Sequence, residues 1–293
     1  MSDNQAQPVS GNKQQRSRRW LLVLVLLLFL VVMWYQTRAD GMLHVLLLET
    51  SGDAMLLKTP DGRVVLIDGG SDPSDLVLQL GHYLSPWQRT LDIMILTRSD
   101  MERLPAQVAV LEHYEVGLVV MAPISGHASM SSYHQALQDA WFALLQQQQT
   151  PVQVLWPGSQ IPLDGALLTV LATGDGDTAG LVLRLDYGTF RMVLAQAAGP
   201  SLDEALLAQA EPITALVYPW SRPLDPLVPA WQPHMILFSH SYEMDDPVLM
   251  TWYERATFVH QGMAGLYHPE LHGTIECITN GQHLTVITER HGQ

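Results

Sequence analysis

The chain has 293 residues, 47% of them hydrophobic, which is enough apolar material for one large domain or two ordinary ones. Its formal net charge of −14 opposes phosphate backbones, so the composition excludes a general nucleic-acid-binding surface, and nucleic acid is not an expected partner. Cys277 is the single cysteine, so an internal disulfide is excluded as well.

The first 36 residues divide into a polar leader and an apolar run. Sixteen residues without a charge, Trp20 to Tyr35, follow a leader that carries Lys13 and three arginines. Tryptophan and tyrosine at the ends of such a run suit the membrane interface, and the basic side faces the cytoplasm. The pattern predicts a disordered cytoplasmic leader over residues 1–19 and a single membrane anchor over residues 20–36.

The alternative for this run is a cleaved signal peptide, because Thr37-Arg38-Ala39 resembles a small-residue cleavage site. In both cases the rest of the chain is exported. The expected location is the cell membrane, with one span, the N-terminus inside and a folded domain over residues 41–290 outside. From residue 40 onward, 10 Lys and Arg stand against 28 Asp and Glu, a net charge of about −18.

The first half of the exported domain alternates between strand and helix patterns. Apolar runs predict strands at 43–48, 54–58 and 64–68, and Pro60-Asp61-Gly62 between the last two predicts a hairpin. Asp72 before Pro73 is typical of a helix start. Strands are predicted at 91–96 and 116–121, and helices at 106–113 and 131–147.

A dense cluster of charged residues follows the predicted strand at 91–96. Arg98, Asp100, Glu102 and Arg103 come within seven residues of Leu96. Charged residues at the end of a buried strand are typical of a catalytic or binding site. A guanidinium, however, stays protonated and has no lone pair to offer a metal ion.

The second half continues the same style without repeating the sequence. Strands are predicted at 167–171, 181–187, 190–194, 215–218 and 235–238, and helices at 202–210 and 247–256. Asn280-Gly281 predicts a terminal hairpin between strands at 273–278 and 283–288. Strands with flanking helices in both halves predict two sheets packed face to face, with the helices outside.

This order of elements, together with the local sequence, resembles the metallo-β-lactamase fold, and more narrowly the soluble domain of the ComEC competence family. The family domain opens with a strand close to HVxFLDVGQGDAxLLxTPDGxxxLIDGG. This chain has His44 to Ala54 (HVLLLETSGDA), then Thr59-Pro60-Asp61-Gly62 and Leu66 to Gly70 (LIDGG). The resemblance covers residues 43–288 and implies an α/β sandwich of four layers, αββα, after the N-terminal span.

The chain departs from the family at the metal-binding motifs. The family's ligand loop, T-H-x-D-x-D-H-x-G-G, is here Thr97 to Ala106 (TRSDMERLPA), with arginine at both histidine positions. Ala195-Gln196-Ala197 stands where a bridging aspartate is expected, and Pro219 to Pro223 (PWSRP) replaces P-H-H-G-S. The resulting vestigial site comprises Asp68, Arg98, Asp100, Glu102, Arg103, Ala197, Trp220, Ser221 and Asp246.

A hydrolytic zinc site needs three or four imidazole and carboxylate ligands around an open position. With arginine, alanine, tryptophan and serine in those places, we expect no catalytic residues, no bound metal and no cofactor. We expect Arg98 and Arg103 to pair with Asp68, Asp100 or Glu102. The alternative is that both arginines point to solvent over a filled cleft.

Two classes of function follow. The first is a membrane-anchored, catalytically inactive metallo-β-lactamase-like domain that binds an unknown protein or small-molecule ligand, or acts as a scaffold. The second is a divergent metal-dependent hydrolase, acting on phosphodiesters with zinc or manganese. A relocated metal site built from His240, Asp246 and His268 is a further alternative. His268 and His272 are four residues apart, but Pro269 argues against a helix there.

Overall fold

The computed structural model describes residues 20–25, 27–28, 39–123, 131–174, 180–222, 224, 226–239 and 265–290. The chain forms two compact units, Met1–Arg38 and Ala39–Gln293. In the first unit, residues 20–25 and 27–28 are helical, and most of the expected anchor at 20–36 lies outside the described residues, as does the leader. No helix among the residues that the structure describes is both long and apolar enough to cross a bilayer.

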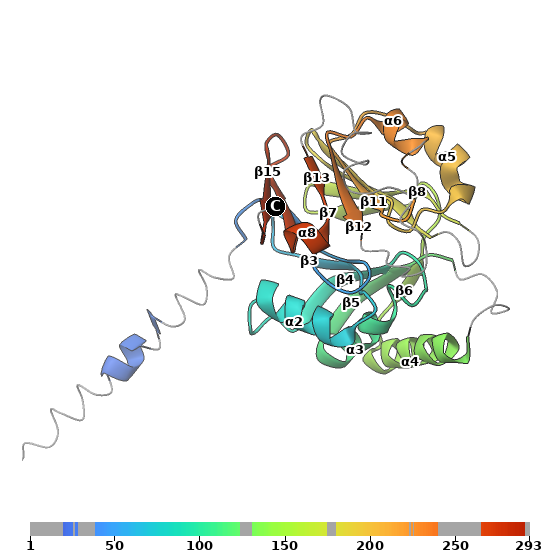
Figure 1. Ribbon diagram of the computed structural model, residues 1–293. Coiled ribbons are helices and arrows are strands. Elements are labelled where there is room, and N and C mark those ends of the chain that lie inside the picture. The colour runs from blue at the N-terminus through green and yellow to red at the C-terminus, as the bar shows by residue number, and fades with distance from the viewer. Residues whose placement is uncertain are drawn as a thin grey trace, which may run out of the picture. The chain divides into compact units, whose positions relative to one another are not determined.

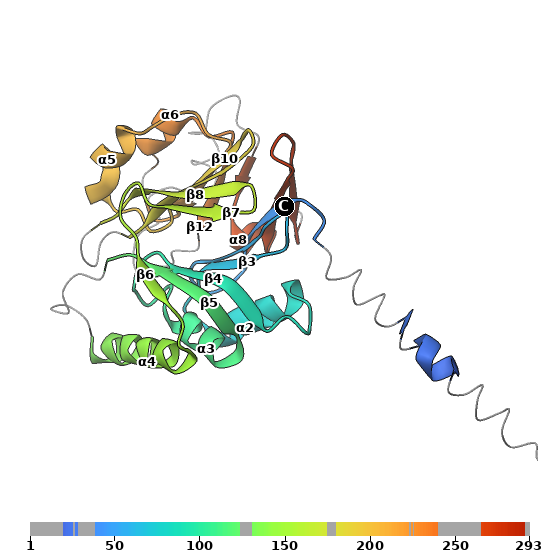
Figure 2. The ribbon, with the colours of Figure 1, turned by 180° about the vertical axis from the view of Figure 1, so that it is seen from behind.

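The second unit contains two mixed β-sheets packed face to face, with helices on both outer sides (Figures 1 and 2). The first sheet has eight described strands in the order β15-β14-β1-β2-β3-β4-β5-β6. In chain order they are β1 (Leu43–Leu47), β2 (Ala54–Lys58), β3 (Val64–Asp68), β4 (Thr90–Leu96), β5 (Glu115–Met121), β6 (Val152–Val154), β14 (Ile275–Thr279) and β15 (Leu284–Thr288).

The second sheet has seven described strands in the order β13-β12-β11-β10-β9-β8-β7. In chain order they are β7 (Gln160–Leu163), β8 (Ala166–Ala172), β9 (Val182–Tyr187), β10 (Phe190–Leu194), β11 (Ala215–Pro219), β12 (Met235–Ser239) and β13 (Gly265–Tyr267). Alternate residues of the strands in both sheets point inward and form one apolar core between them, which includes Val45, Ile67, Ile95, Leu183 and Leu237.

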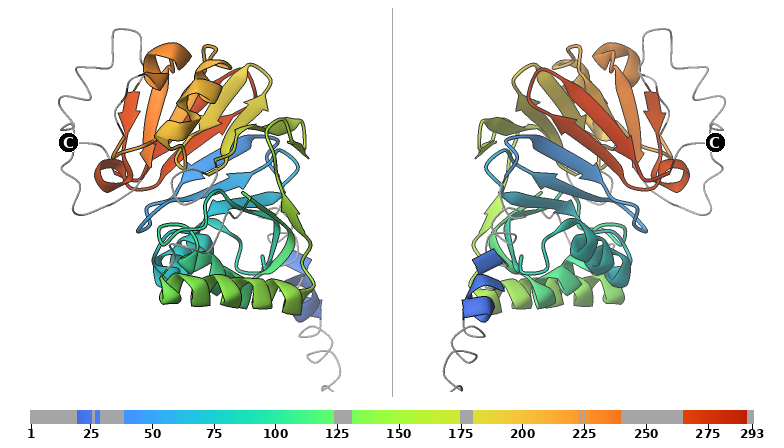
Figure 3. Two further views of the ribbon diagram at one scale, coloured as in Figure 1. Left: turned by 90° about the vertical axis from the view of Figure 1, so that its right-hand side faces the viewer. Right: turned by 90° about the vertical axis from the view of Figure 1, so that its left-hand side faces the viewer.

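Separate apolar clusters join the helices to the outer faces of the sheets. The helices α2 (Pro73–Tyr83), α3 (Pro105–His113) and α4 (Ser132–Gln148) cover the first sheet, and Trp141 of α4 is fully buried there. The helices α5 (Asp203–Leu207) and α6 (Leu227–Trp231) cover the second. The four layers, helix, sheet, sheet and helix, are seen edge-on in Figure 3, and this is the αββα arrangement that the sequence predicts.

Local signals in the sequence explain where several elements begin and turn. The side chain of Asp72 accepts hydrogen bonds from the amides of Ser74 and Asp75, so it caps α2 as predicted. The 59–62 segment joins the antiparallel strands β2 and β3, and Asn280-Gly281 lies between β14 and β15. These two hairpins confirm the turn predictions.

Other predictions need correction. A short helix, α8 (Pro269–His272), lies where Pro269 was taken as evidence against one. Proline is tolerated at the first helical position, where its missing N–H has no partner to lose. The helix predicted at 202–210 is a 3₁₀ turn (Pro200–Leu202) followed by α5, which ends at Leu207 because the chain then turns toward β8, where Gln209 donates to the Leu171 carbonyl. The helix predicted at 247–256 lies outside the described residues.

Parallel pairing sets the position of the site. β3, β4 and β5 run parallel in the first sheet, and β10, β11 and β12 run parallel in the second. The carboxyl ends of parallel strands meet at one edge of a sheet, where side chains from several strands converge. Asp68 ends β3, Thr97 follows β4 and Gln196 follows β10, and contacts among these three residues show that the two edges meet.

Candidate functional site: a buried guanidinium among carboxylates

Arg103 is the centre of the site. Its side chain is fully buried, with 0% exposure, between the carboxyl ends of the two sets of parallel strands. One terminal nitrogen, Nη2, donates to Asp53 and, at 2.9 Å, to the carbonyl oxygen of Gln196. The other, Nη1, donates to Asp100 at 2.5 Å. One guanidinium therefore joins the loop after β4, the start of β2 and the end of β10.

Two further carboxylates complete the surroundings of Arg103. The Nε atom of Arg103 lies 3.6 Å from an oxygen of Asp68, and Nη1 lies 3.5 Å from an oxygen of Glu102. Arg98 also binds Asp100, through its Nε, but its side chain is 23% exposed. The expected pairing with Asp68, Asp100 or Glu102 is thus present: Arg103 has all three carboxylates around it, and Arg98 pairs with Asp100.

Asp68 is held in place by its own backbone and by its neighbours. Its φ of 58° is in the left-handed region, which a residue other than glycine adopts at an energetic cost of about 1–3 kcal/mol. In this conformation the carboxylate accepts hydrogen bonds from the Thr97 amide at 2.8 Å and the Thr97 hydroxyl at 2.7 Å. The side-chain amide of Gln196 donates to it at 3.2 Å. Asp68 therefore links β3, β4 and the end of β10.

The charges do not balance when every group is ionised. Four carboxylates (Asp53, Asp68, Asp100 and Glu102) surround two guanidinium groups, which leaves two negative charges in excess. Burial of a charge without a full partner is costly, so the carboxyl groups respond by holding their protons more tightly. The excess negative charge therefore raises the pKa of some of these carboxyl groups.

The direction of each shift follows from burial and from the distance to the arginines. Burial raises the pKa of Asp68 to about 6 and that of Glu102 to about 7, although Arg103 opposes both shifts. Burial also raises the pKa of Asp53. Burial alone would raise the pKa of Asp100 too, but the guanidinium groups of Arg103 and Arg98 outweigh it, and this pKa is lowered.

Close backbone contacts close the space around the cluster. The Gly180 amide donates to the Ala197 carbonyl at 2.9 Å, and the Leu181 amide donates to the Thr97 carbonyl at 2.8 Å. A Cβ atom on Gly180 would lie 2.9 Å from the Cβ atoms of Ala197 and Arg98, which is closer than real Cβ atoms approach. Ala197 therefore lies beside the Arg98 loop, where it contributes packing and a carbonyl oxygen.

Among the remaining predicted site residues, Trp220 and Ser221 follow β11. The ring of Trp220, after β11, packs edge-on against Phe238 at 5.0 Å and His268 at 4.7 Å between centroids, and against the core under α5 and α6. Ser221 follows it in the same turn. Asp246 and His240 lie outside the described residues, so the relocated metal site cannot be placed.

Two members of the cluster were missed by the sequence analysis. Asp53 binds the Arg103 guanidinium across 50 residues of sequence, and Gln196 accepts from it across 93. Asp53 stands directly before the buried strand β2, in the Gly-Asp-Ala run that matches the family, and this was a usable signal. For Gln196 the only usable signal was its location shortly after the strand at 190–194. An amide side chain in place of an expected aspartate does not indicate which residue it binds.

A metallo-β-lactamase-like fold implies a metal between the sheet edges, and the residues present do not fit one. One oxygen of Asp53 and one of Asp100 already accept from Arg103. A fixed guanidinium at the centre also repels any second cation. Within the described part of the chain, no group of three His, Cys, Asp or Glu side chains is arranged to hold a metal ion.

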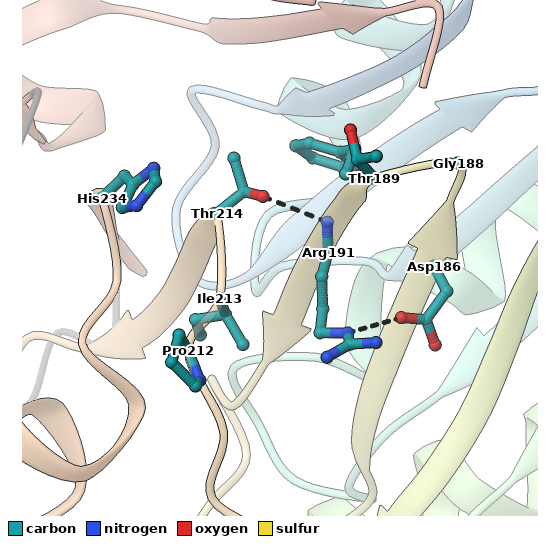
Figure 4. Close-up of a pocket in the computed structure, with 9 residues that line it drawn as sticks. Asp186, Gly188, Thr189, Arg191, Pro212, Ile213, Thr214 and His234 are labelled. Carbon is teal, nitrogen blue, oxygen red and sulfur yellow. Dashed lines mark hydrogen bonds and ion pairs between the residues drawn. The ribbon is translucent and has the colours of Figure 1, made fainter. Parts of the chain in front are cut away.

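A cavity lies at the opposite end of the second sheet, beside the starts of β10 and β11 (Figure 4). Its volume is about 290 Å³, and Asp186, Arg191, Thr214 and His234 are among its lining residues. Arg191 is paired with Asp186 at 2.8 Å and with Glu211 at 2.7 Å. These charges neutralise one another, so the cavity presents no unpaired charge from Arg191 to a ligand.

Comparison with known proteins gives structural likeness without sequence matches. No protein-family model matches the sequence, and no curated protein matches it either. A diphosphatase from the PhnP family is 12% identical, over 80% of this chain and 96% of that one, with a TM-score of 0.50. A mutant of the β-hydroxylase CmlA is 13% identical over 81% of this chain, with a TM-score of 0.51, and this chain spans 53% of its length.

A third similar structure is the metallo-β-lactamase fold protein YhfI from Bacillus subtilis. It is 14% identical, the match covers 78% of this chain and 96% of that one, and the TM-score is 0.48. At such identities a likeness shows the fold alone, not the chemistry. The four-layer arrangement, together with the likenesses at TM-scores of 0.50 and 0.51, confirms that the part of this chain after residue 38 has the metallo-β-lactamase fold.

Proposed function

We propose that this protein is a membrane-anchored, catalytically inactive metallo-β-lactamase-like domain, related to the soluble domain of the ComEC family, that acts in binding or as a scaffold. The observation that carries the proposal is the position of Arg103. Its buried guanidinium takes the carboxylate oxygens at the edge where the family holds its ions. The arginine supplies the positive charge that the carboxylates require, so the fold needs no metal.

Inactivity follows from the chemistry of the residues in this place. Metal-assisted hydrolysis needs a bound water made acidic by an open metal position. Guanidinium groups donate hydrogen bonds but hold no such water, and the backbone bonds around Gly180 and Leu181 fill the space. The ComEC relation rests on the HVLLLETSGDA, TPDG and LIDGG runs of the sequence. Its partner is an unknown protein or small-molecule ligand.

Metal analysis of the purified full-length chain tests the proposal. After dialysis we expect less than one tenth of an equivalent of zinc, manganese or iron. We also expect no hydrolysis of a phosphodiester such as bis(p-nitrophenyl) phosphate when these metals are added. A variant in which Arg98 and Arg103 are both changed to His is the matched control, because it restores imidazoles at the two family positions. Stoichiometric metal in the natural chain contradicts the proposal.

A divergent metal-dependent hydrolase is the second candidate, and one observation favours it. The carboxylates around Arg103 exceed the nearby arginines by two charges, so the cluster retains negative charge. A similar fold is seen in a diphosphatase of the PhnP family, at 12% identity. Metal-dependent phosphodiester cleavage by the natural chain, lost on chelation, is the result that would select this candidate.

Membrane anchoring by residues 20–36 is part of the proposed function. The charge-free run from Trp20 to Tyr35 and the basic leader before it support a retained span with the N-terminus in the cytoplasm. We expect the full-length chain to stay in the membrane fraction after extraction with alkaline carbonate, and to be released by detergent. Release by carbonate, with a new N-terminus near Ala39, would instead indicate a cleaved signal peptide.

A further inference from the structure

The edge strand β6 lies within a long segment that carries no charge. Residues 140–163 contain no Asp, Glu, Lys, Arg or His over 24 positions, in a chain whose net charge is −14. This stretch spans the second half of α4, β6, the connecting turn and β7. β6 ends the first sheet and β7 ends the second, so the stretch forms the rim of both sheets on one side of the molecule (Figure 3).

Proteins normally protect an open sheet edge with charged residues or proline. Pro162 lies within β7, and at the far edge of the first sheet β15 lies between His283 and the Glu289-Arg290 pair. β6 has neither a charged residue nor a proline within its three residues, and the residue that directly precedes it is Pro151. Val152, Val154 and Trp156 are instead 41%, 42% and 59% exposed. Val152 and Val154 are two residues apart in the strand, so they lie on one face, and Trp156 follows two residues after its end.

The hydrogen-bond pattern of β6 leaves two residues facing outward. Pro151 accepts from the Val119 amide at 2.9 Å, and the Leu155 amide donates to Met121 at 3.1 Å, so the odd-numbered residues bond toward β5. In a ladder, successive residues turn their amides to opposite sides. The N–H and C=O groups of Val152 and Val154 therefore point away from β5, where no described strand follows.

We propose that β6 is a homodimerisation edge, which pairs antiparallel with β6 of a second copy about a two-fold axis at Gln153. In this register Val152 of each copy lies opposite Val154 of the other copy. Each of these two pairs exchanges two backbone hydrogen bonds. Gln153 faces Gln153 of the second copy. The pairing joins the two eight-stranded sheets into one continuous sheet.

Charge and symmetry select a second copy over another occupant. Two molecules that each carry −14 repel one another over most of their surfaces, and contact costs least where both surfaces are neutral. The Val-Gln-Val sequence of β6 is the same when read in either direction, so the edge is complementary to itself. The exposed Val152 and Val154 supply apolar area on the same face of each copy.

The mass of the full-length chain in mild detergent, measured by light scattering after size exclusion, tests the pairing. We expect twice the 32.6 kDa of one chain. Changing Val152 and Val154 together to Lys places like charges directly opposite one another, and we expect the mass to halve. The matched control changes Leu78 and Leu271, exposed apolar residues outside β6, to Lys and is expected to stay dimeric. A cooperative melting transition shows that each variant is folded.

A disulfide test fixes the register. In an antiparallel pair, residues opposite each other have Cα atoms about 4.5–5.5 Å apart, within the range that a disulfide spans. Gln153→Cys is therefore expected to cross-link two copies under mild oxidation, while Gln282→Cys, in the terminal hairpin, is not. The native Cys277 is buried and does not interfere. A monomeric natural chain, a dimer that survives the double lysine change, or no cross-link at 153 overturns the proposal.

Discussion

Replacing Arg103 by Met is expected to destabilise the fold by about 3–5 kcal/mol, because it leaves buried carboxylates without their cation. Asp53 and Asp68 are each about 1% exposed, so neither can recover hydration when the guanidinium is lost. A domain has only about 5–15 kcal/mol of stability in total. Chemical denaturation of the purified chain, with the midpoint and slope compared to the natural protein, measures the loss.

Arg98→Met is the matched control, because Arg98 binds the same Asp100 from a position that is 23% exposed. Exposed pairs contribute about 0–1 kcal/mol, so this change is expected to cost far less. Arg103→Lys keeps the charge, but a compact ammonium cannot bind Asp53, Asp100 and the Gln196 carbonyl with the same planar geometry, and an intermediate loss is expected. Equal losses for the two methionine variants would show that Arg103 does not neutralise the cluster.

If Arg103→Met leaves too little folded protein, Asp53→Asn in the same background provides a second measurement. Removing one buried negative charge relieves part of the imbalance, so the double variant is expected to be more stable than Arg103→Met alone. Neighbouring charged residues commonly couple by 0.5–3 kcal/mol in such cycles. Strict additivity of the two changes would argue against direct pairing of Arg103 with Asp53.

Stability is expected to fall as the pH rises from about 4.5 to about 7. The pKa of Asp68 is raised to about 6 from 3.8, and that of Glu102 to about 7 from 4.5. Between each pair of values the folded protein binds more protons than the unfolded chain, so raising the pH favours unfolding. Each group contributes on the order of 3 kcal/mol over its full shift, since one unit of pKa corresponds to about 1.4 kcal/mol.

Two other groups define the limits of this window. Hydrogen bonding to Glu276 raises the pKa of His44, so its stabilising contribution is also lost as the pH rises through its folded-state pKa. The lowered pKa of Asp100 acts in the opposite sense, but only as the pH falls below its ordinary value of 3.8. Melting temperatures measured from pH 4.5 to 8 check the slope. Glu102→Gln should flatten it, and a natural protein whose stability rises across this range would contradict the assignment.

Much of the fold could be predicted because its signals are local. Asp72-Pro73, Pro60-Asp61-Gly62 and Asn280-Gly281 each act through their own backbone, and the structure has a cap or a turn at all three. The strands β6 and β7 were missed because they are three and four residues long, too short for a period-2 pattern to stand out. Their pairing depends on the sheets, which no local pattern encodes.

Only the part of the site that the loop after β4 contributes could be predicted from the sequence. Arg98, Asp100, Glu102 and Arg103 lie within six residues of one another, and their pairing follows from charge alone. Whether Arg103 points inward depends on Asp53 and Gln196, which reach it from distant strand ends. The left-handed backbone of Asp68 was likewise invisible, since nothing in the LIDGG run distinguishes it from an extended strand end.

The guanidinium at the sheet edges has a consequence for how the molecule is made. An ion taken from solution must be captured after synthesis, and its occupancy varies with supply, with competing chelators and with acidity. Arg103 is delivered with the polypeptide, once per molecule. On the proposed function, maturation of this domain does not depend on metal homeostasis, and starvation for trace elements is expected to leave its abundance unaltered.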